Sequence, residues 1–137
     1  MKRVIAALIL LTLLNTFVSA QFTLKIVIRN LENSKGQIII DFRDGDNKIL
    51  KAQFGKIIDK QCVVTINNLK TEKYLFKYFH DENENKKLDT NFIGIPKEGY
   101  GFSNNAKGNF GPPDYKNTIF EVKNDTTVIC KAHYINL

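Results

Sequence analysis

The 137-residue chain carries 20 Lys and Arg against 14 Asp and Glu, giving a formal net charge of +6, and 43% of its residues are hydrophobic. This length predicts one domain, large enough to bury a core without cross-links. Because the lysines are dispersed and never form a long block, the charge indicates a solvated surface and argues against nucleic-acid binding.

The first twenty residues have the pattern of a secretory signal. Lys2 and Arg3 precede an apolar run at 4–14, and Val18-Ser19-Ala20 matches the small-residue site of signal peptidase. The apolar run is shorter than a membrane span, which argues against a retained anchor. We therefore expect a signal peptide at 1–20 and a single mature domain at 21–137, of 137 − 20 = 117 residues, exported to the periplasm or the cell exterior and free of the membrane.

The mature chain reads as a succession of short β-strands. Alternating apolar and polar residues with β-branched and aromatic enrichment predict strands at 22–30, 36–44, 62–69, 74–80, 118–123 and 126–135, with a weaker edge segment at 49–58. Turn residues separate these segments, and helical spacing is absent beyond the signal. The pattern predicts an all-β fold, an antiparallel Greek-key β-sandwich of the immunoglobulin- or prealbumin-like kind.

Two local features leave alternatives open. Leu69 is followed five positions later by Tyr74 at the start of a strand, which fits either a tyrosine corner or an ordinary strand aromatic. Cys62 and Cys130 both lie in alternating strands of an exported chain. They could form a disulfide across the core or remain two buried thiols, and their spacing in the sequence does not decide between these.

The segment 92–117 breaks the strand rhythm. It holds all three prolines, five of the eight glycines and five aromatic residues, among them Tyr100, Phe102 and Phe110. Disordered segments are poor in aromatics, so we expect one long ordered loop that packs these rings against the sandwich. The alternative is that the rings form a platform for a protein or glycan partner.

The stretch FHDENENKKLDTNF at 79–92 is the strongest chemical signal. Counted from Asp81, oxygen-bearing side chains fall at positions one, three, five and nine, and the carbonyl of Lys87 falls at position seven. This is the spacing of a calcium-binding loop, in which alternate residues of a tight turn point at one centre. The side-chain ligands predicted for calcium are Asp81, Asn83, Asn85 and Asp89.

Two positions depart from that pattern. Lys86 stands where Gly is usual, and Phe92 stands where a bidentate Glu is usual, so Asn91, Glu98 or water would complete the coordination. With two formal charges on the ion, we expect a dissociation constant of about 10⁻⁴ to 10⁻³ M. The alternative is a solvated hairpin loop closed by Asx-turns without any ion.

His80 precedes Asp81 and invites a catalytic interpretation. Alternation with Phe76 and Tyr78 predicts that His80 faces inward and is hydrogen-bonded to loop backbone. A hydrolase using His80, Asp81, Asp89 and Glu98 is the enzymatic alternative, but crowding in one hydrophilic turn argues against the separated pKa values that acid–base catalysis needs. We expect no enzymatic activity.

Three motifs resemble those of a bacterial family of exported proteins, domain-of-unknown-function family 2141. They read HDENENKKLDTN at 80–91, GIPKEGYGFSNN at 94–105 and GPP at 111–113. The resemblance covers essentially the whole mature chain, with Lys86 in place of the family's usual Gly. It implies export and an important loop and supplies no reaction. The sequence thus predicts a monomeric binding or structural module, with calcium at 81–91 ordering the loop at 92–117.

Overall fold

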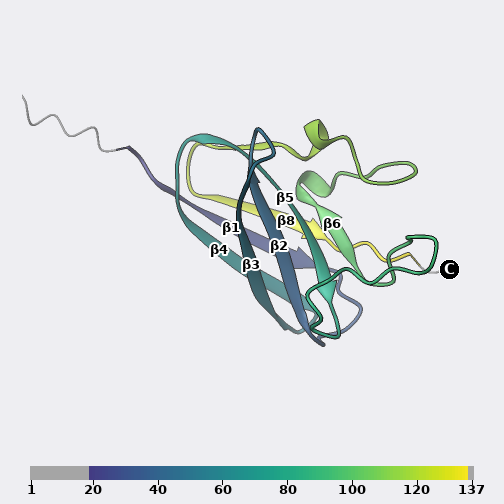
Figure 1. Ribbon diagram of the computed structural model, residues 1–137. Coiled ribbons are helices and arrows are strands. Elements are labelled where there is room, and N and C mark those ends of the chain that lie inside the picture. Colours follow the sequence, from purple (N-terminus) through teal and green to yellow (C-terminus); the bar gives the residue numbers. More distant parts are fainter. Residues whose placement is uncertain (1–18, 136–137) are drawn as a thin grey trace, which may run out of the picture.

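The structure is a computed structural model that describes residues 19–135. The predicted signal peptide falls almost entirely on residues 1–18, which lie outside this range. Within it, no helix is long and apolar enough to cross a membrane. The elements, shown in Figure 1, are β1 (Phe22–Arg29), β2 (Gln37–Asp44), β3 (Ile49–Ile58), β4 (Gln61–Leu69), β5 (Glu72–Asp81), β6 (Tyr100–Phe102), η1 (Ser103–Asn105), η2 (Tyr115–Thr118), β7 (Phe120–Val122) and β8 (Thr126–Lys131).

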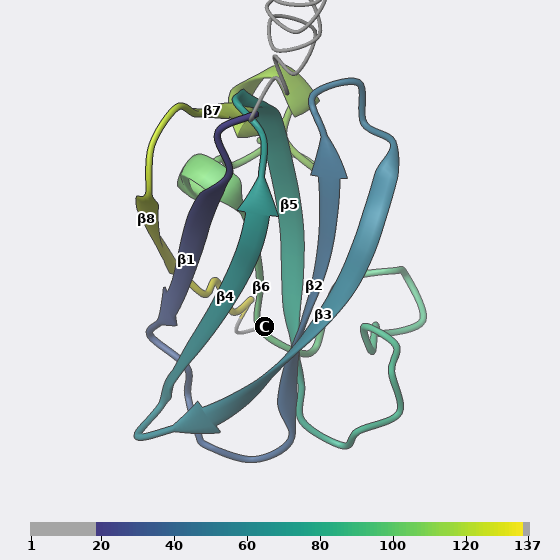
Figure 2. The same ribbon diagram turned by 90° about the vertical axis from the view of Figure 1, so that its left-hand side faces the viewer.

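The strands form one mixed sheet that nearly closes into a barrel. Its order is β6-β5-β2-β3-β4-β1-β8, with β7 beside β5. β3 joins β4 only at Ile57 and Ile58 next to their hairpin, and Figure 2 shows the two strands diverging toward their other ends. At the opposite side of the sheet, Tyr100 and His133 exchange two backbone hydrogen bonds (2.9 and 2.8 Å) and bring the two edges together.

One pairing corrects the prediction of a purely antiparallel fold. β8 runs parallel to β1, with Ile28 opposite Cys130. Strands joined by a tight hairpin are forced to be antiparallel, but β1 and β8 are the first and last strands of the chain. Nothing in the local sequence therefore constrains their relative direction.

Alternation along the strands decides which side chains enter the core. In β1, Leu24, Ile26 and Ile28 are fully buried while Lys25 between them is exposed, as predicted. Tyr74 is buried, and its hydroxyl donates to the carbonyl of Lys70 (3.2 Å). A strand-opening tyrosine bonded to backbone a few residues upstream is a tyrosine corner, which settles that alternative.

The two cysteines remain free thiols. Cys62 and Cys130 both pair with Ile28, from β4 on one side and β8 on the other. Two strand spacings separate them by about 9.6 Å, beyond the roughly 7 Å that a disulfide can span. Burial raises the pKa of each thiol to about 11, so both stay protonated at neutral pH.

The segment 92–117 is more structured than a single loop. It contains β6, which pairs with β5, and η1, whose side chains bond to three neighbouring segments. The Ser103 hydroxyl accepts from the N–H of Phe76 in β5 (3.1 Å). The Asn104 amide donates to the carbonyls of Asn117 in η2 and Ile119 directly before β7 (3.1 and 2.8 Å). Asn105 donates to a carbonyl of β8 and accepts from the N–H of Lys131 (2.8 Å).

The prediction that the aromatics of this segment pack inward is only partly right. Tyr100 and Phe102 are half-buried and lie edge to face, with ring centroids 6.3 Å apart. Phe110, by contrast, is fully exposed, as is Phe92. Both exposed rings lie in stretches without regular structure, so no strand period holds them against the core.

Removing the Tyr78 hydroxyl should stabilise the protein. Tyr78 is buried, and its oxygen has no hydrogen-bond partner among the described residues. A buried unsatisfied polar group costs about 1–3 kcal/mol, so Tyr78→Phe should raise the free energy of unfolding by about 1 kcal/mol or more. Urea denaturation measures the change. Tyr74→Phe, which removes a bonded hydroxyl, is the control and should destabilise.

Candidate functional site

The acidic turn begins where β5 ends and lies beside the start of β2. Gln37 pairs with Asp81 at this end of the sheet, and the chain then bends through residues 82–89 before returning toward β6. Asp81 is completely buried although it directly follows the inward-facing His80, so its burial departs from the alternation of β5 and is imposed by the neighbouring segments. A buried carboxylate has to be satisfied by hydrogen bonds from the chain.

Asp81 organises the backbone of the turn. Its Oδ1 accepts the N–H of Asn85 (3.0 Å), and its Oδ2 accepts the N–H of Lys86 (3.1 Å). A third donor, Nε2 of Gln37, reaches Oδ2 at 3.0 Å from β2. The Asp81 carboxylate thus holds the backbone of Asn85 and Lys86, so the turn is folded around this carboxylate.

The side chains at positions three, five and nine meet one another. Asp89 accepts hydrogen bonds from the amide of Asn83 (2.6 Å) and the amide of Asn85 (3.0 and 3.1 Å). The other amide atom of each asparagine closes an Asx-turn: Oδ1 of Asn83 accepts from Asn85 (3.2 Å), and Oδ1 of Asn85 accepts from Lys87 (2.8 Å). The side chains of Asn83, Asn85 and Asp89 therefore meet one another, while the Asp81 carboxylate faces the backbone of the same turn.

The remaining predicted residues, Glu98, Asn91 and Lys87, form hydrogen bonds with backbone or side-chain groups of this turn or the next one. Within residues 19–135, their side chains form no hydrogen bond with the Asp89 carboxylate. Glu98 is buried, and its two oxygens accept the N–H groups of Glu82 (2.9 Å) and Asp89 (3.0 Å). Asn91 accepts two N–H groups of the next turn. Lys87 is exposed and contributes its N–H to Asn85. Glu98 thus connects both ends of the turn through backbone.

The backbone at position six has the conformation that calcium loops usually assign to glycine. Lys86 has φ = 64°, in the left-handed region, and Glu84 has φ = 59°. Such angles are uncommon for residues with a side chain and are strained by about 1 kcal/mol. The turn therefore adopts this shape without the glycine.

His80 is held in a hydrogen-bonded chain beside the turn, facing inward as predicted. It is fully buried, and its Nε2 lies 2.7 Å from the carbonyl of Lys35, which can only accept. Nε2 therefore carries the proton, and Nδ1 accepts from the Tyr134 hydroxyl (2.7 Å). Burial raises the pKa of Tyr134 to about 12, which keeps that donor protonated.

Sequence reasoning missed several residues that build this site. Tyr134, Gln37 and Lys35 all reach it from strands or loops distant in the sequence. Gly99 belongs with them, because a Cβ there would lie 2.3 Å from the Tyr134 ring. The glycine was visible in the sequence, but its role depends on a ring 35 positions away and could not be read locally.

The composition of the site sets what it can hold. Among residues 19–135, no group of three or more His, Cys, Asp or Glu side chains is placed to bind a metal ion. The inward-facing set consists instead of two carboxylates and two amides, Asp81, Asp89, Asn83 and Asn85. Carboxylate and amide oxygens fit hard cations such as calcium better than zinc or other thiophilic metals, but in this structure both amides turn their nitrogens toward Asp89.

Comparison with protein-family models places the chain in a family. A family model described as an uncharacterised protein conserved in bacteria (DUF2141) matches residues 26–130. No curated protein and no solved structure matched the chain. The match runs from within β1 to within β8 and includes the whole acidic turn.

Proposed function

Because this chain belongs to the bacterial DUF2141 family, which has no characterised activity, we propose its role from the geometry of the turn: it is a small exported β-module whose acidic turn binds calcium. The observation that supports this is that the side chains of Asn83 and Asn85 meet Asp89, while Asp81 accepts the N–H of Asn85 in the same turn. A bound ion held by these residues would be connected to Glu98 through the N–H of Asp89, and would thereby order the segment that leads to β6.

The ligand set predicts a modest affinity. Calcium would take oxygens from the two carboxylates and, once the amides turn their oxygens inward, from Asn83 and Asn85. The amide nitrogens now donate to Asp89, so the ion would replace these hydrogen bonds. With two formal charges on the ion and Lys86 and Lys87 exposed nearby, the dissociation constant should lie at about 10⁻⁴ to 10⁻³ M.

Calcium should raise the melting temperature of the protein. At about 10 mM calcium the stabilisation is roughly 1.4 to 2.7 kcal/mol over this affinity range, or about 5–10 °C for a domain of this size. Differential scanning calorimetry with calcium, with EDTA and with magnesium at matched ionic strength measures it. Magnesium, which demands a regular octahedral site, should have little effect.

The matched variants are Asp89→Asn and Asp44→Asn. Asp44 closes a comparable turn between β2 and β3 by accepting the N–H groups of Asp46 and Lys48 (3.0 and 2.9 Å). Asp89→Asn should remove the calcium shift, and Asp44→Asn should leave it intact. Equal melting temperatures in calcium and EDTA for the unmodified chain would reject the proposal in favour of a ligand-free turn.

Replacing Lys86 by glycine should stabilise the turn and tighten calcium binding. Glycine adopts φ = 64° without steric cost, so Lys86→Gly should recover up to about 1 kcal/mol of the free energy of unfolding with or without calcium. Removing the positive charge of Lys86 next to the ion should separately lower the calcium dissociation constant by up to about fivefold. Isothermal titration calorimetry and urea denaturation measure both effects. Lys60, with φ = 60° in the β3–β4 hairpin, is the control: Lys60→Gly should leave calcium affinity unchanged.

The finer description of the fold belongs to the same proposal. The tyrosine corner at Tyr74 and the divergence of β3 from β4 support a Greek-key sandwich of two layers, β3-β2-β5-β6 and β4-β1-β8.

Phe92 and Phe110, both fully exposed, are proposed as contact points for a protein or glycan partner. The hydrolase alternative is disfavoured, because both His80 nitrogens and all four oxygens of Asp81 and Glu98 are engaged within the chain.

A further inference from the structure

A second site of opposite charge lies where β6 and β8 separate. The two edges are joined by the backbone bridge between Tyr100 and His133. Beyond that bridge, the side chain of Asn105 replaces a neighbouring strand by bonding to the N–H of Lys131 and the carbonyl of Ile129. Because a side chain takes the place of strand backbone there, the edges stay apart and leave a pocket of about 310 Å³.

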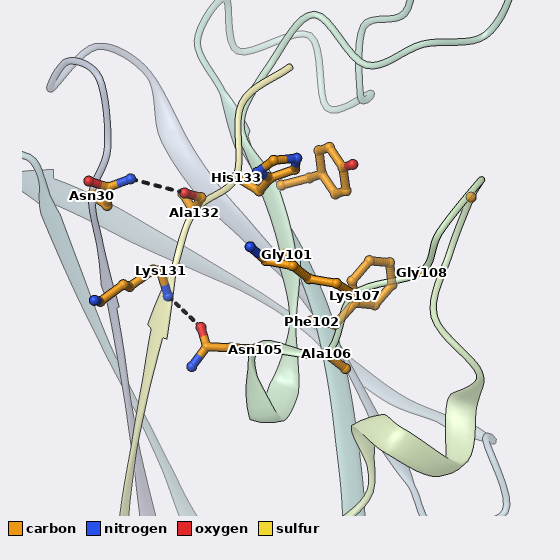
Figure 3. Close-up of a pocket in the computed structure, with 12 residues that line it drawn as sticks. Asn30, Gly101, Phe102, Asn105, Ala106, Lys107, Gly108, Lys131, Ala132 and His133 are labelled. Atoms are coloured by element: carbon orange, nitrogen blue, oxygen red, sulfur yellow. Dashed lines mark hydrogen bonds between the residues drawn. The ribbon is translucent and has the colours of Figure 1, made fainter. Parts of the chain in front are cut away.

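The pocket is positively charged. The basic residues that line it in the described chain are Lys107, Lys131 and His133, with no Asp or Glu among the lining residues. Within residues 19–135, neither lysine lies within 4.0 Å of a carboxylate oxygen. Figure 3 shows the Lys107 side chain reaching across the pocket toward Ala132 and His133, while the Lys131 side chain points away.

The walls offer flat apolar contact beside this charge. Tyr100 stands edge-on to His133, with ring centroids 5.6 Å apart at 77°, and Phe102 packs edge-on against Tyr100. The Asn30 amide already donates to the carbonyl of Ala132, directly after β8 (3.2 Å), and the Asn105 amide to that of Ile129 in β8 (3.1 Å), which holds the rim in place. The pocket is therefore preformed, with one cationic group inside it and aromatic surfaces around it.

We propose that this pocket binds a small organic anion that carries one carboxylate or phosphate on a planar or apolar body. At roughly 30 Å³ per non-hydrogen atom, the volume accommodates about ten such atoms. The ammonium group of Lys107 pairs with the anionic group, and Tyr100, Phe102 and His133 contact the body. This site shares none of the predicted calcium ligands and is independent of the calcium proposal.

Titration of the full mature chain by ¹H–¹⁵N correlation spectroscopy tests the site, with sodium benzoate, phenyl phosphate and the uncharged analogue benzamide as probes. EDTA is present throughout, so the result does not depend on calcium. We expect saturable shifts of amides at 100–108 and 131–133 with the two anions, weaker at higher salt, and little response to benzamide. The tighter-binding anion identifies the preferred charged group.

Lys107→Ala should weaken anion binding by about fivefold or more, whereas Lys51→Ala, which removes an exposed lysine of β3, should leave it unchanged. Three results would each overturn the proposal: no saturable shift up to roughly 10 mM anion, equal binding of benzamide, or binding that Lys107→Ala does not weaken. Calcium melts are unaffected by any of these outcomes, so the two proposals fail separately.

Discussion

Gly36→Ala is expected to cost about 3 kcal/mol or more of the free energy of unfolding. Gly36 has φ = 65°, and a Cβ there would lie 2.0 Å from the carbonyl oxygen of Asp81 and 2.8 Å from Cα of Glu82. Both neighbours are backbone, so no side chain can move aside. The left-handed angle costs about 1 kcal/mol, and separating the start of β2 from the end of β5 adds roughly 1–3 kcal/mol.

Gly94→Ala separates these two contributions. Gly94 has φ = 86°, and a Cβ there would meet nothing within 4 Å. This variant should lose only about 1 kcal/mol, the cost of the backbone angle. Urea denaturation of both variants gives the difference. Equal losses at the two positions would show that the close approach of Gly36 to the acidic turn does not constrain the fold.

Asp81→Ala is expected to destabilise the protein by about 3 kcal/mol and to abolish any calcium response. The carboxylate is fully buried and accepts three hydrogen bonds, from Gln37, Asn85 and Lys86. Hydrogen bonds to a charged group contribute about 1.5–3 kcal/mol each, and water can replace only part of them here. Urea denaturation measures the loss, and calorimetry with calcium measures the response.

Two further variants show whether the effect belongs to this turn. Asp81→Asn keeps the shape but offers an amide nitrogen in place of one acceptor oxygen, so it should lie between the unmodified chain and Asp81→Ala. Asp44→Ala removes a partly buried acceptor of two N–H groups and should cost about 1 kcal/mol. A loss at Asp81 no greater than that at Asp44 would contradict the central role assigned to the buried carboxylate.

Gly36 and Asp81 lie at the same place, where β2 begins and β5 ends. The close backbone approach at one residue and the triple hydrogen bond at the other fix the base of the acidic turn to the sheet. The exposed part of the turn, from Asn83 to Lys87, extends from this base. The proposed cation site therefore stands on a base that the sheet holds in place.

Local sequence was sufficient for much of the structure. Alternation placed β1 to β5 within two residues of their observed ends, because a strand with one buried face has a period of two. The side chains of Asn83, Asn85 and Asp89 meet within one tight turn, which determines the direction of near neighbours, while the assignment of these residues and Asp81 as calcium ligands stays a prediction. The inward position of His80 followed from the same period.

Other features depend on residues that are far apart in the sequence. The parallel pairing of β1 with β8, the separation of Cys62 from Cys130 and the contact of Tyr134 with His80 arise from the order in which strands meet, which short-range spacing does not encode. The sequence by itself determined the strands and the shape of the acidic turn, because both rest on interactions between near neighbours in the chain. Only the tertiary structure decided the closure of the sheet, the partners of the buried polar groups and the basic pocket, because each requires segments from both ends of the chain to pack side by side.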